Sequence, residues 1–488
     1  MTAKPTVQVV IIGSGAGGAM TAHVLAEAGY SVLILEEGRR WALSDYGNNC
    51  PEGMKKMYRR RGMTPIMGSV PIGYAEGCCY GGGTEINSGF WHRTPPEILL
   101  RWKAQYDLAD SYPKDLEPHF IWLEKNLHVS LHGREWPAST RMFARGIEAM
   151  DWSYQEVPRV VEGCESLNFC PNGCPSGAKR SMSLSLLPQA EKNGARVLTN
   201  CRVKMLIKRN KRITGVLANL LREDGTQELI RIDAEHVFVC CGATETPSLL
   251  RRSGIRFHIG DSFRVHPMLK VAAQYNEDIN AHKSVMPLLQ VKEFWPEISL
   301  GGAFFANGHL AMLLSENWPD NNLLMHQYTK MALFYVAVRG TGKGTIRSSL
   351  TGEDTTSIRY DLSAEDLRHL SKGLARLSAL LLAGGAKTVY PAVYAIEPIA
   401  DEISAIRWLD QLLPKAGISL TTIHAFSSCP IGERIDRCAA DSFGKVYHFD
   451  NVYINDGSMI PDSPGVNPQG TIMAFARRNA LNFVETNK

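Results

Sequence analysis

The stretch Val-Gln-Val-Val-Ile-Ile-Gly-Ser-Gly-Ala-Gly-Gly, residues 7–18, decides the fold of this chain. Its first six residues are apolar with one exception and mostly β-branched, which predicts a strand buried on both faces of a parallel sheet. A helix-compatible run over 19–28 follows and ends at Gly29, and a second apolar strand over 31–35 leads to Glu36. This order of strand, glycine turn, helix and strand is typical of a dinucleotide-binding unit.

Each element of this unit has a physical role. Gly13 permits the tight turn, Gly15 lets the backbone approach a pyrophosphate, and Gly18 allows the helix to pack closely on the strand. The start of the helix offers unpaired N–H groups to the phosphates, Ala16 in the preceding turn is expected to contact the cofactor, and Glu36 is placed to accept hydrogen bonds from an adenosine ribose. FAD and nicotinamide cofactors both use such a unit, and a purely structural glycine turn is the third possibility.

The composition is that of an ordinary globular protein. With 488 residues the chain is too long for one simple core, so we expect two domains. The 53 Lys and Arg residues against 49 Asp and Glu residues leave a formal charge of only +4, which gives no indication of a nucleic-acid partner or an anionic membrane. No apolar run approaches the roughly 20 residues that span a bilayer.

The cellular location is predicted from the start of the chain and from the cysteines. The first ten residues lack the charged start, apolar stretch and cleavage site of a secretory signal. Eleven cysteines, an odd number in a long chain, indicate reduced thiols rather than a disulfide framework. We therefore expect a cytoplasmic protein.

The carboxyl-terminal part carries a second set of motifs. Residues 451–458 are Asn-Val-Tyr-Ile-Asn-Asp-Gly-Ser, residues 466–477 are Val-Asn-Pro-Gln-Gly-Thr-Ile-Met-Ala-Phe-Ala-Arg, and His424 precedes Ser-Ser-Cys-Pro-Ile-Gly at 427–432. These segments resemble the closing signature and the histidine-containing segment of the glucose-methanol-choline (GMC) oxidoreductases, which are FAD-dependent. The likeness is greatest to bacterial cholesterol oxidase and long-chain alcohol oxidase, which pair a histidine with an asparagine.

Other landmarks occur in the order found in that family. The glycine-rich segment 81–89 resembles the loop beside the isoalloxazine ring, residues 201–204 match a strand whose backbone meets the adenine, and 237–250 resembles the strand and turn that return to the nucleotide. The resemblance implies further FAD contacts at Gly82, Gly83, Asn87, Gly89, Val203, Gly242, Asp456, Gly457, Pro468 and Gln469. It also implies non-covalent FAD, because Ile86 stands where covalently flavinylated members carry a histidine.

The resemblance places the chemistry at His424 and Asn467. Oxidation of an alcohol requires the hydroxyl proton to leave while hydride moves from carbon to the flavin N5. A histidine can accept that proton near neutral pH or act as a hydrogen-bond partner, and an asparagine amide can donate to the oxygen and orient it. His266, before Pro267, is expected to be structural.

The predicted fold class is α/β, with a Rossmann-like FAD-binding domain and a second, substrate-binding domain on a mostly antiparallel sheet. The resemblance implies that both are discontinuous. The FAD-binding domain is expected over 1–95, 190–268 and 425–488, and the substrate-binding domain over 96–189 and 269–424. Within the second domain, Ser363-Ala-Glu-Asp366 predicts a capping box that begins a helix reaching Leu382.

A cysteine-rich segment departs from the family pattern. Cys164, Cys170 and Cys174 are too few and unusually spaced for a structural zinc or iron–sulfur site, which normally takes four ligands. We therefore predict no metal and expect this loop to cover the flavin or to line the substrate entrance.

The substrate and the electron acceptor stay open. The alcohol could be a sugar, a sterol-like or aliphatic alcohol, or an aromatic alcohol, and the acceptor could be oxygen, a quinone or a redox protein. Four tryptophans could wall the pocket, although core packing is commoner for this residue: Trp91, Trp295, Trp318 and Trp408. The alternatives to alcohol oxidation are a flavin-containing lyase of the cyanohydrin-cleaving type, a nicotinamide-dependent dehydrogenase and a flavin-binding protein without catalysis.

Overall fold

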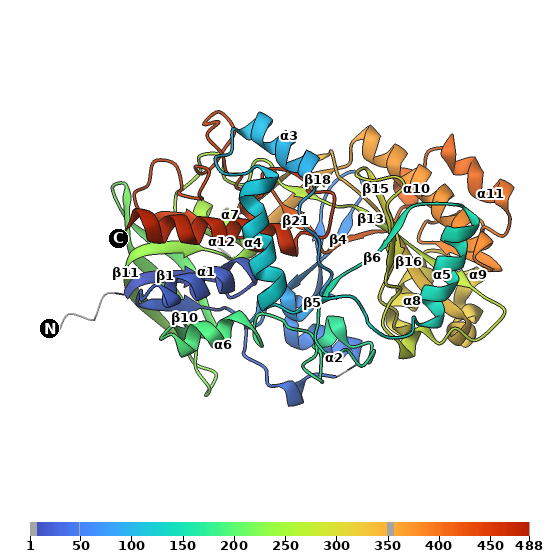
Figure 1. Ribbon diagram of the computed structural model, residues 1–488, viewed down its shortest axis with the longest axis horizontal. Helices are drawn as coiled ribbons and strands as arrows, with labels where there is room; N and C mark the ends of the chain where they lie inside the picture. The colour runs from blue at the N-terminus through green and yellow to red at the C-terminus, as the bar shows by residue number, and fades with distance from the viewer. Residues whose placement is uncertain (1–6, 48, 349–355, 488) are drawn as a thin grey trace.

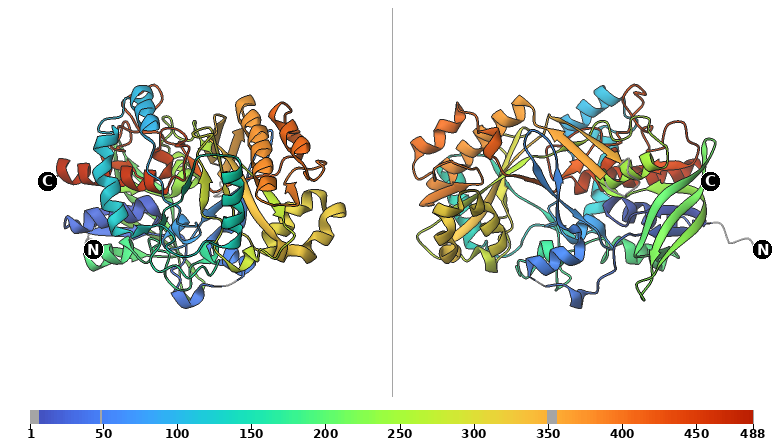
Figure 2. Two further views of the ribbon diagram at one scale, coloured as in Figure 1. Left: turned by 45° about the vertical axis from the view of Figure 1, so that its right-hand side comes forward. Right: turned by 180° about the vertical axis from the view of Figure 1, so that it is seen from behind.

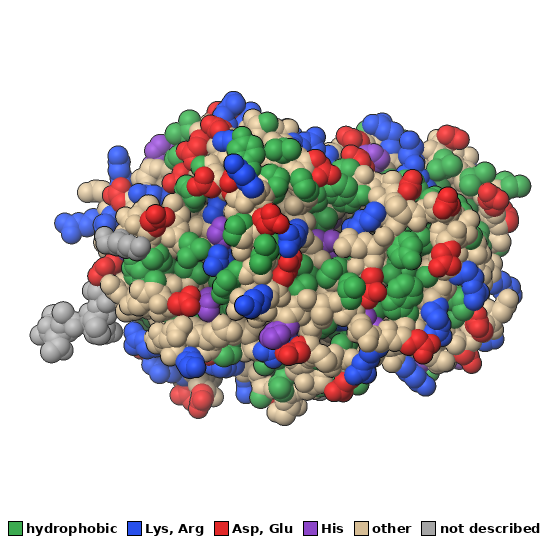
Figure 3. All heavy atoms as spheres, viewed as in Figure 1, with side chains coloured by type: hydrophobic (Ala, Val, Ile, Leu, Met, Phe, Trp, Pro, Cys, Tyr) green, Lys and Arg blue, Asp and Glu red, His purple; other side chains and the backbone are tan. Residues whose placement is uncertain are grey.

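The computed structural model describes residues 7–47, 49–348 and 356–487. Two packed halves lie side by side along the long axis, each built on its own sheet and hydrophobic core (Figure 1). Strand β1 (Val7–Ile12) and helix α12 (Gln469–Thr486) lie in the same half although they come from opposite ends of the chain, and two further views agree (Figure 2). Positive and negative side chains are interspersed over the face in Figure 3, consistent with the small net charge.

The first half is built on a seven-stranded mixed sheet. Its parallel part consists of β8 (Arg196–Leu198), β2 (Val32–Leu35), β1, β11 (Gln227–Val239) and β22 (Val452–Ile454). The amino-terminal part of β11 pairs antiparallel with β10 (Arg212–Leu221), which pairs with β9 (Cys201–Arg209). Five of the six residues of β1 are buried, which agrees with a strand covered on both faces.

Helices from distant parts of the chain cover this sheet. Helix α1 (Ala16–Glu27) packs against α12 and α6 (Leu186–Lys192), and α4 (Pro113–Asn126) packs against α12 (Figure 1). Helix α7 (Gly242–Arg252) follows β11 directly, and α3 (Pro96–Tyr106) contributes to the same core. Four stretches of the chain, 7–35, 96–126, 186–252 and 452–486, thus contribute to this half.

The second half is built on a nine-stranded, mostly antiparallel sheet. The strand order is β3 (Tyr58–Ile66), β4 (Ile72–Gly77), β20 (Leu420–Thr422), β13 (Met268–Gln274), β16 (Met331–Val338), β15 (Ile298–Gly302), β14 (Leu289–Val291) and β6 (Tyr154–Glu156), with β19 (Thr388–Pro391) also paired to β13. Within this sheet, the β4–β20 pair is the only parallel pair among the described strands.

Helix α10 (Ala364–Ala383) packs on this second sheet beside α5 (Ala138–Ala149) and α11 (Glu402–Ile406) (Figure 1). Its predicted capping box is present: Ser363 Oγ accepts from Asp366 N at 2.9 Å, and the Asp366 carboxylate accepts from Ser363 N at 3.1 Å.

The remaining elements are α2 (Cys50–Met57), α8 (Asn307–Leu314), α9 (Trp318–Asn321), β5 (Val129–Ser130), β7 (Arg159–Val160), β12 (Arg264–Val265), β21 (Ala425–Phe426), β17 (Lys343–Ser348) and β18 (Thr356–Asp361).

Sheet membership departs from the predicted domain ranges in two places. Strands β3 and β4 lie within 1–95 but pair into the second sheet. Helices α3 and α4 lie within 96–189 but pack in the first core. The division into domains stays a prediction, and the two halves exchange more chain than the predicted ranges allow.

The start of helix α1 differs from the sequence expectation because of close backbone packing. Helix α1 begins at Ala16 rather than at residue 19, so Gly17 and Gly18 are helical despite the low helix propensity of glycine. A Cβ on Gly17 would lie 2.0 Å from the carbonyl oxygen of Asn455, so close packing overrides propensity here. Helix α12 begins at Gln469, directly after Pro468.

Two further properties bear on the cellular setting. Within the described residues no helix has the length and apolar character needed to cross a membrane. All eleven cysteines are free thiols.

Candidate active site

A cavity of about 410 Å³ lies between the two halves, lined by residues of both sheets. Of the predicted cofactor and catalytic residues, those that line it are Gly13, Gly15, Ala16, Glu36, Gly82, Gly83, Asn87, Val203, Gly242, His424, Asp456, Gly457, Asn467, Pro468 and Gln469. Gly18 and Gly89 do not line it. The fold therefore brings segments more than 450 residues apart, such as those of Gly13 and Gln469, to one cavity.

The glycine turn has the shape that a pyrophosphate cradle requires. Gly13 has φ +99°, and a Cβ there would lie 2.3 Å from the carbonyl oxygen of Cys240. A Cβ on Gly15 would meet only the Cα of Gly82, at 4.0 Å, so this position opens into the cavity. No side chain caps the start of α1, which leaves its first N–H groups for an anion.

Glu36 and Asp456 are buried carboxylates that hold the cavity walls. Glu36 accepts from the backbone N–H of Ser14 at 2.9 Å, from its hydroxyl at 2.6 Å, and from Gly38 N at 2.8 Å. Asp456 accepts from Gly242 N and from Ser458 N, both at 2.8 Å, and thereby joins the start of α7 to the carboxyl-terminal segment. Burial raises the pKa of both carboxyl groups, and the donors that face them oppose this shift.

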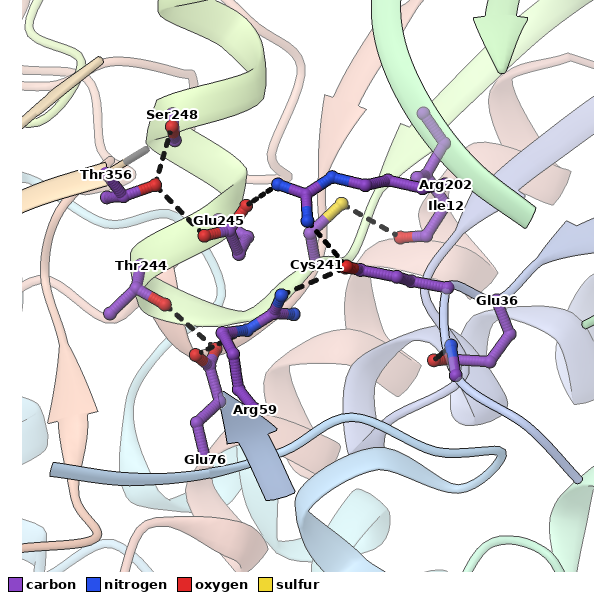
Figure 4. A network of polar contacts seen from close by, with 12 residues as sticks. Ile12, Glu36, Arg59, Glu76, Arg202, Cys241, Thr244, Glu245, Ser248 and Thr356 are labelled. Atoms are coloured by element: carbon purple, nitrogen blue, oxygen red, sulfur yellow. Dashed lines mark hydrogen bonds and ion pairs between the residues drawn. The ribbon is translucent and has the colours of Figure 1, made fainter. Parts of the chain in front are cut away.

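A partly buried network of charged residues, shown in Figure 4, contributes to the cavity lining. Arg59 donates to Glu76 at 2.9 Å and to Glu37 at 3.0 Å, and Arg202 donates to Glu37 at 2.7 Å and approaches Glu245 at 3.6 Å. Burial raises the pKa of Glu76 to about 7, although the charge of Arg59 lowers it. None of these residues stands out in the sequence, because they come from four separate elements without a common motif.

The glycine-rich loop 81–89 is held in place from both sides. Asn87 donates to the side chain of Gln469 at 2.6 Å, which connects the loop to the start of α12. The buried Lys179 ammonium donates to the carbonyls of Glu85, Asn87 and Cys170 at 2.6, 2.9 and 2.6 Å. Burial lowers the pKa of Lys179.

Lys179 also connects this loop to the cysteine-rich segment. There Arg159 donates to Cys164 Sγ at 3.6 Å and to Cys170 Sγ at 3.2 Å. Although burial alone would raise it, hydrogen bonding with His132 and the charge of Arg159 lower the pKa of Cys164 to about 6. The segment reaches the large cavity through Pro171, while its cysteines line a separate, smaller one. Across the described parts of the chain, no cluster of three or more His, Cys, Asp or Glu side chains is arranged to hold a metal ion.

His424 and Asn467 meet at the junction of the two halves. His424 follows β20, Asn467 precedes α12, and the Nε2 atom of His424 lies 3.1 Å from the Nδ2 atom of Asn467. His424 Nδ1 lies 3.0 Å from His266 Nδ1, and His266 Nε2 accepts from Gly465 N at 3.2 Å. Burial lowers the pKa of His424 to about 4 and, together with the charges of His424 and Arg339, places that of His266 well below 6.5.

A second chain of hydrogen bonds reaches Asn467 from the other side. Lys292 donates to Gln290 Oε1 at 3.3 Å, and Gln290 Nε2 donates to Asn467 Oδ1 at 3.2 Å and to the Tyr335 hydroxyl at 2.6 Å. The sequence reasoning missed Gln290, Lys292 and Tyr335 and gave His266 only a structural role. For His266, the His-Pro pair was an available signal in the sequence. The other three residues lie on or beside strands of the antiparallel sheet, where no sequence motif marks them. None of the four tryptophans considered for the pocket is among the residues that line the cavity.

Comparison with known proteins agrees with this architecture. Models of GMC oxidoreductases match residues 54–268 and 340–476, and an FAD binding domain model matches 6–48. A GMC-type oxidoreductase of Sinorhizobium fredii is 38% identical over 471 residues, covering 96% of this chain and 93% of the relative. A long-chain-alcohol oxidase of Arabidopsis thaliana is 25% identical over 516 residues, covering 97% of this chain and 66% of the relative. The crystal structure of pyridoxine 4-oxidase from Mesorbium loti superposes with a TM-score of 0.71 at 15% identity, covering 98% and 99% of the two chains.

The glycine turn gives a test that separates folding from cofactor binding. Gly17→Ala should destabilise the protein by about 3 kcal/mol, because the new Cβ would meet the backbone of Asn455 at 2.0 Å. Gly15→Ala should keep the fold and lower the FAD content, because its methyl group enters the cavity. Thermal unfolding and the flavin released by denaturation measure the two effects. A normal FAD content in Gly15→Ala would contradict the assignment of this turn to the pyrophosphate.

Proposed function

The chain belongs to the GMC oxidoreductase family, and from that membership and the geometry of the cavity we propose that it oxidises an alcohol with non-covalently bound FAD. The proposal is supported by the FAD-binding match at 6–48, by the open cradle at Gly15, and by Ile86 in place of a histidine that could bind flavin covalently. The likeness to long-chain-alcohol oxidases favours an aliphatic alcohol over the alternatives.

The observation that carries the proposal is the direction of the hydrogen bonds at the centre. A backbone N–H can only donate, so Gly465 N requires an unprotonated Nε2 on neutral His266. The proton of His266 is then on Nδ1 and is donated to His424 Nδ1. Neutral His424 consequently carries its own proton on Nε2, the atom that faces Asn467.

The chain of hydrogen bonds that starts at Lys292 also ends at an N–H donor. A lysine amine group donates to Gln290 Oε1, so the amide nitrogen of Gln290 is directed at Asn467 Oδ1. The amide nitrogen of Asn467 is therefore directed at His424. Two N–H donors, His424 Nε2 and Asn467 Nδ2, converge on one region, where a single acceptor oxygen satisfies both.

We assign this pair of donors to the hydroxyl oxygen of the substrate. Donors fixed in advance stabilise the negative charge that develops on the oxygen as its proton leaves. When bound, FAD supplies the acceptor for the hydride of the carbinol carbon. Because both donors face the oxygen, its O–H bond points into the open cavity, from which the proton can pass to solvent. Of the two roles considered for His424, this arrangement supports hydrogen-bond partner over base.

The remaining parts of the proposal concern the cell. Eleven free thiols favour a reducing compartment, and we propose the cytoplasm. Oxygen, a quinone or a redox protein would take the electrons from the reduced enzyme.

The proposed function is tested by mixing the holoprotein anaerobically with a panel of primary and secondary alcohols. Bleaching of the flavin absorbance is expected with at least one class of alcohol. Asn467→Asp should slow this reduction by about 10²- to 10³-fold at normal FAD content, because it replaces a donor with a carboxylate. The exposed Asn193→Asp is the matched control. A flavin that stays oxidised with every alcohol would contradict the proposal.

The role of His266 has its own test. His266→Ala should slow flavin reduction by roughly tenfold, because it releases His424 to carry its proton on either nitrogen. His266→Gln should recover part of the rate, since its amide can accept from Gly465 N and donate to His424. Equal rates in the two variants would contradict this hydrogen-bonding role of His266.

The pH dependence separates the two roles of His424. Its pKa is lowered to about 4, so the imidazole stays neutral until the pH falls to that range. The rate constant of flavin reduction should be nearly constant from about pH 7.5 down to pH 5 and should decline as the pH approaches 4. A loss of half the rate near pH 6.5, measured where the fold is intact, would indicate an ordinary histidine base.

A further inference from the structure

A row of side chains crosses the second sheet beside the reaction centre. Gln290 on β14 pairs with Gly301 on β15, Gly301 pairs with Tyr335 on β16, and Tyr335 pairs with Lys270 on β13. Directly paired residues project from the same face of a sheet. Gly301 leaves space for the Tyr335 hydroxyl, which accepts from Gln290 at 2.6 Å. Gln290, Tyr335 and Lys270 all line the cavity.

Lys270, at the end of this row, is a cation without a counterion. Within residues 7–47, 49–348 and 356–487, no hydrogen-bond acceptor or carboxylate is paired with its side-chain nitrogen. The carboxylates that line the cavity lie at its nucleotide end, each bonded to protein donors there: Glu36, Glu37, Glu76, Glu245 and Asp456. An unpaired charge that is partly removed from water is costly, so a lysine that lines a cavity indicates a ligand of opposite charge.

The neighbours of Lys270 do not cancel its charge. Burial lowers the pKa of Lys270 to about 8, which leaves most of the amine protonated at neutral pH. Burial and then the charge of Lys270 lower the pKa of His309 to about 3, so this second cavity residue stays neutral. The ring of His309 contacts Phe304 at 5.2 Å between centroids.

The position of Lys270 sets the length of the ligand. His266, Met268 and Lys270 alternate along one stretch of chain and all line the cavity. At about 3.3 Å per residue, the backbone of Lys270 lies roughly 13 Å from that of His266, which contacts His424. Apolar side chains are also part of the cavity lining, among them Met268, Met286, Phe304 and Met312, and Phe304 contacts His309.

We propose that the substrate is an alcohol with an apolar body that ends in a negatively charged group, a carboxylate or a phosphate, and that Lys270 binds this group. The inference rests on the proposed function, because it takes the hydroxyl to be held by His424 and Asn467. It adds the substrate class: the anionic group and the carbinol lie at opposite ends of the molecule, so small 2-hydroxy acids are excluded.

The test compares matched substrates on the holoprotein. Flavin reduction is measured anaerobically with ω-hydroxycarboxylates of increasing chain length, with the methyl ester of each, and with the corresponding ω-hydroxyalkyl phosphates. Above a minimum length, the reduction efficiency of the anion should exceed that of the ester by roughly ten- to hundredfold. The larger of the carboxylate and phosphate ratios identifies the group that Lys270 binds.

Variants of Lys270 assign the preference to this residue. Lys270→Met should bring the anion-to-ester ratio to about one, and Lys270→Arg should keep a ratio well above one. The exposed Lys283→Met is the matched control and should leave the wild-type ratio unchanged. FAD content and thermal unfolding show whether each variant is folded.

Two outcomes would overturn the inference: a wild-type ratio near one at every chain length, or an undiminished ratio in folded Lys270→Met. If the esters and the anions reduce the flavin with equal efficiency, only the proposed substrate class is wrong. If no alcohol, charged or neutral, bleaches it, the proposed function itself fails.

Discussion

At Gly13 and Gly17, backbone segments that are distant in the sequence pack so closely that no side chain would fit between them. A Cβ on Gly13 would lie 2.3 Å from the carbonyl oxygen of Cys240, and one on Gly17 would lie 2.0 Å from that of Asn455. These two close contacts hold the carboxyl ends of β1, β11 and β22 next to the start of α1. Asp456 can then accept from Gly242 N, and the carboxyl-terminal segment is anchored where it passes into the cavity. The cradle and the reaction centre both depend on this approach.

Hydrogen-bond direction is the corresponding constraint at the reaction centre. In the proposed arrangement, each of two chains begins at a group that can donate, the N–H of Gly465 and the amine of Lys292, and each ends at a donor directed at the substrate oxygen. Burial supports the arrangement, because imidazoles with lowered pKa values stay neutral and keep one proton each. A site of this kind has few charges of its own. Its N–H donors stabilise the negative charge that develops on the ligand during the reaction.

Lys179 and Lys270 have contrasting surroundings. Lys179 donates to three backbone carbonyls and holds the glycine-rich loop, which makes it part of the scaffold. Lys270 lines the cavity on a strand of the second sheet and is paired with no acceptor among the described residues. This difference in partners, rather than burial alone, distinguishes a structural cation from one available to a ligand.

The sequence by itself determined the elements whose signals are local. The strand over 7–12, the glycine turn, the capping box at Ser363 and the motifs around His424 and Asn467 depend on residues near one another in the chain, so their patterns could be recognised. Tertiary structure decided what those residues meet. The pairing of His266 with His424, the Gln290–Tyr335–Lys270 row, the Arg59 network and the exchange of β3 and β4 into the second sheet all arise from strand order and register. Register is set by packing between distant segments, and no single stretch of sequence carries that information.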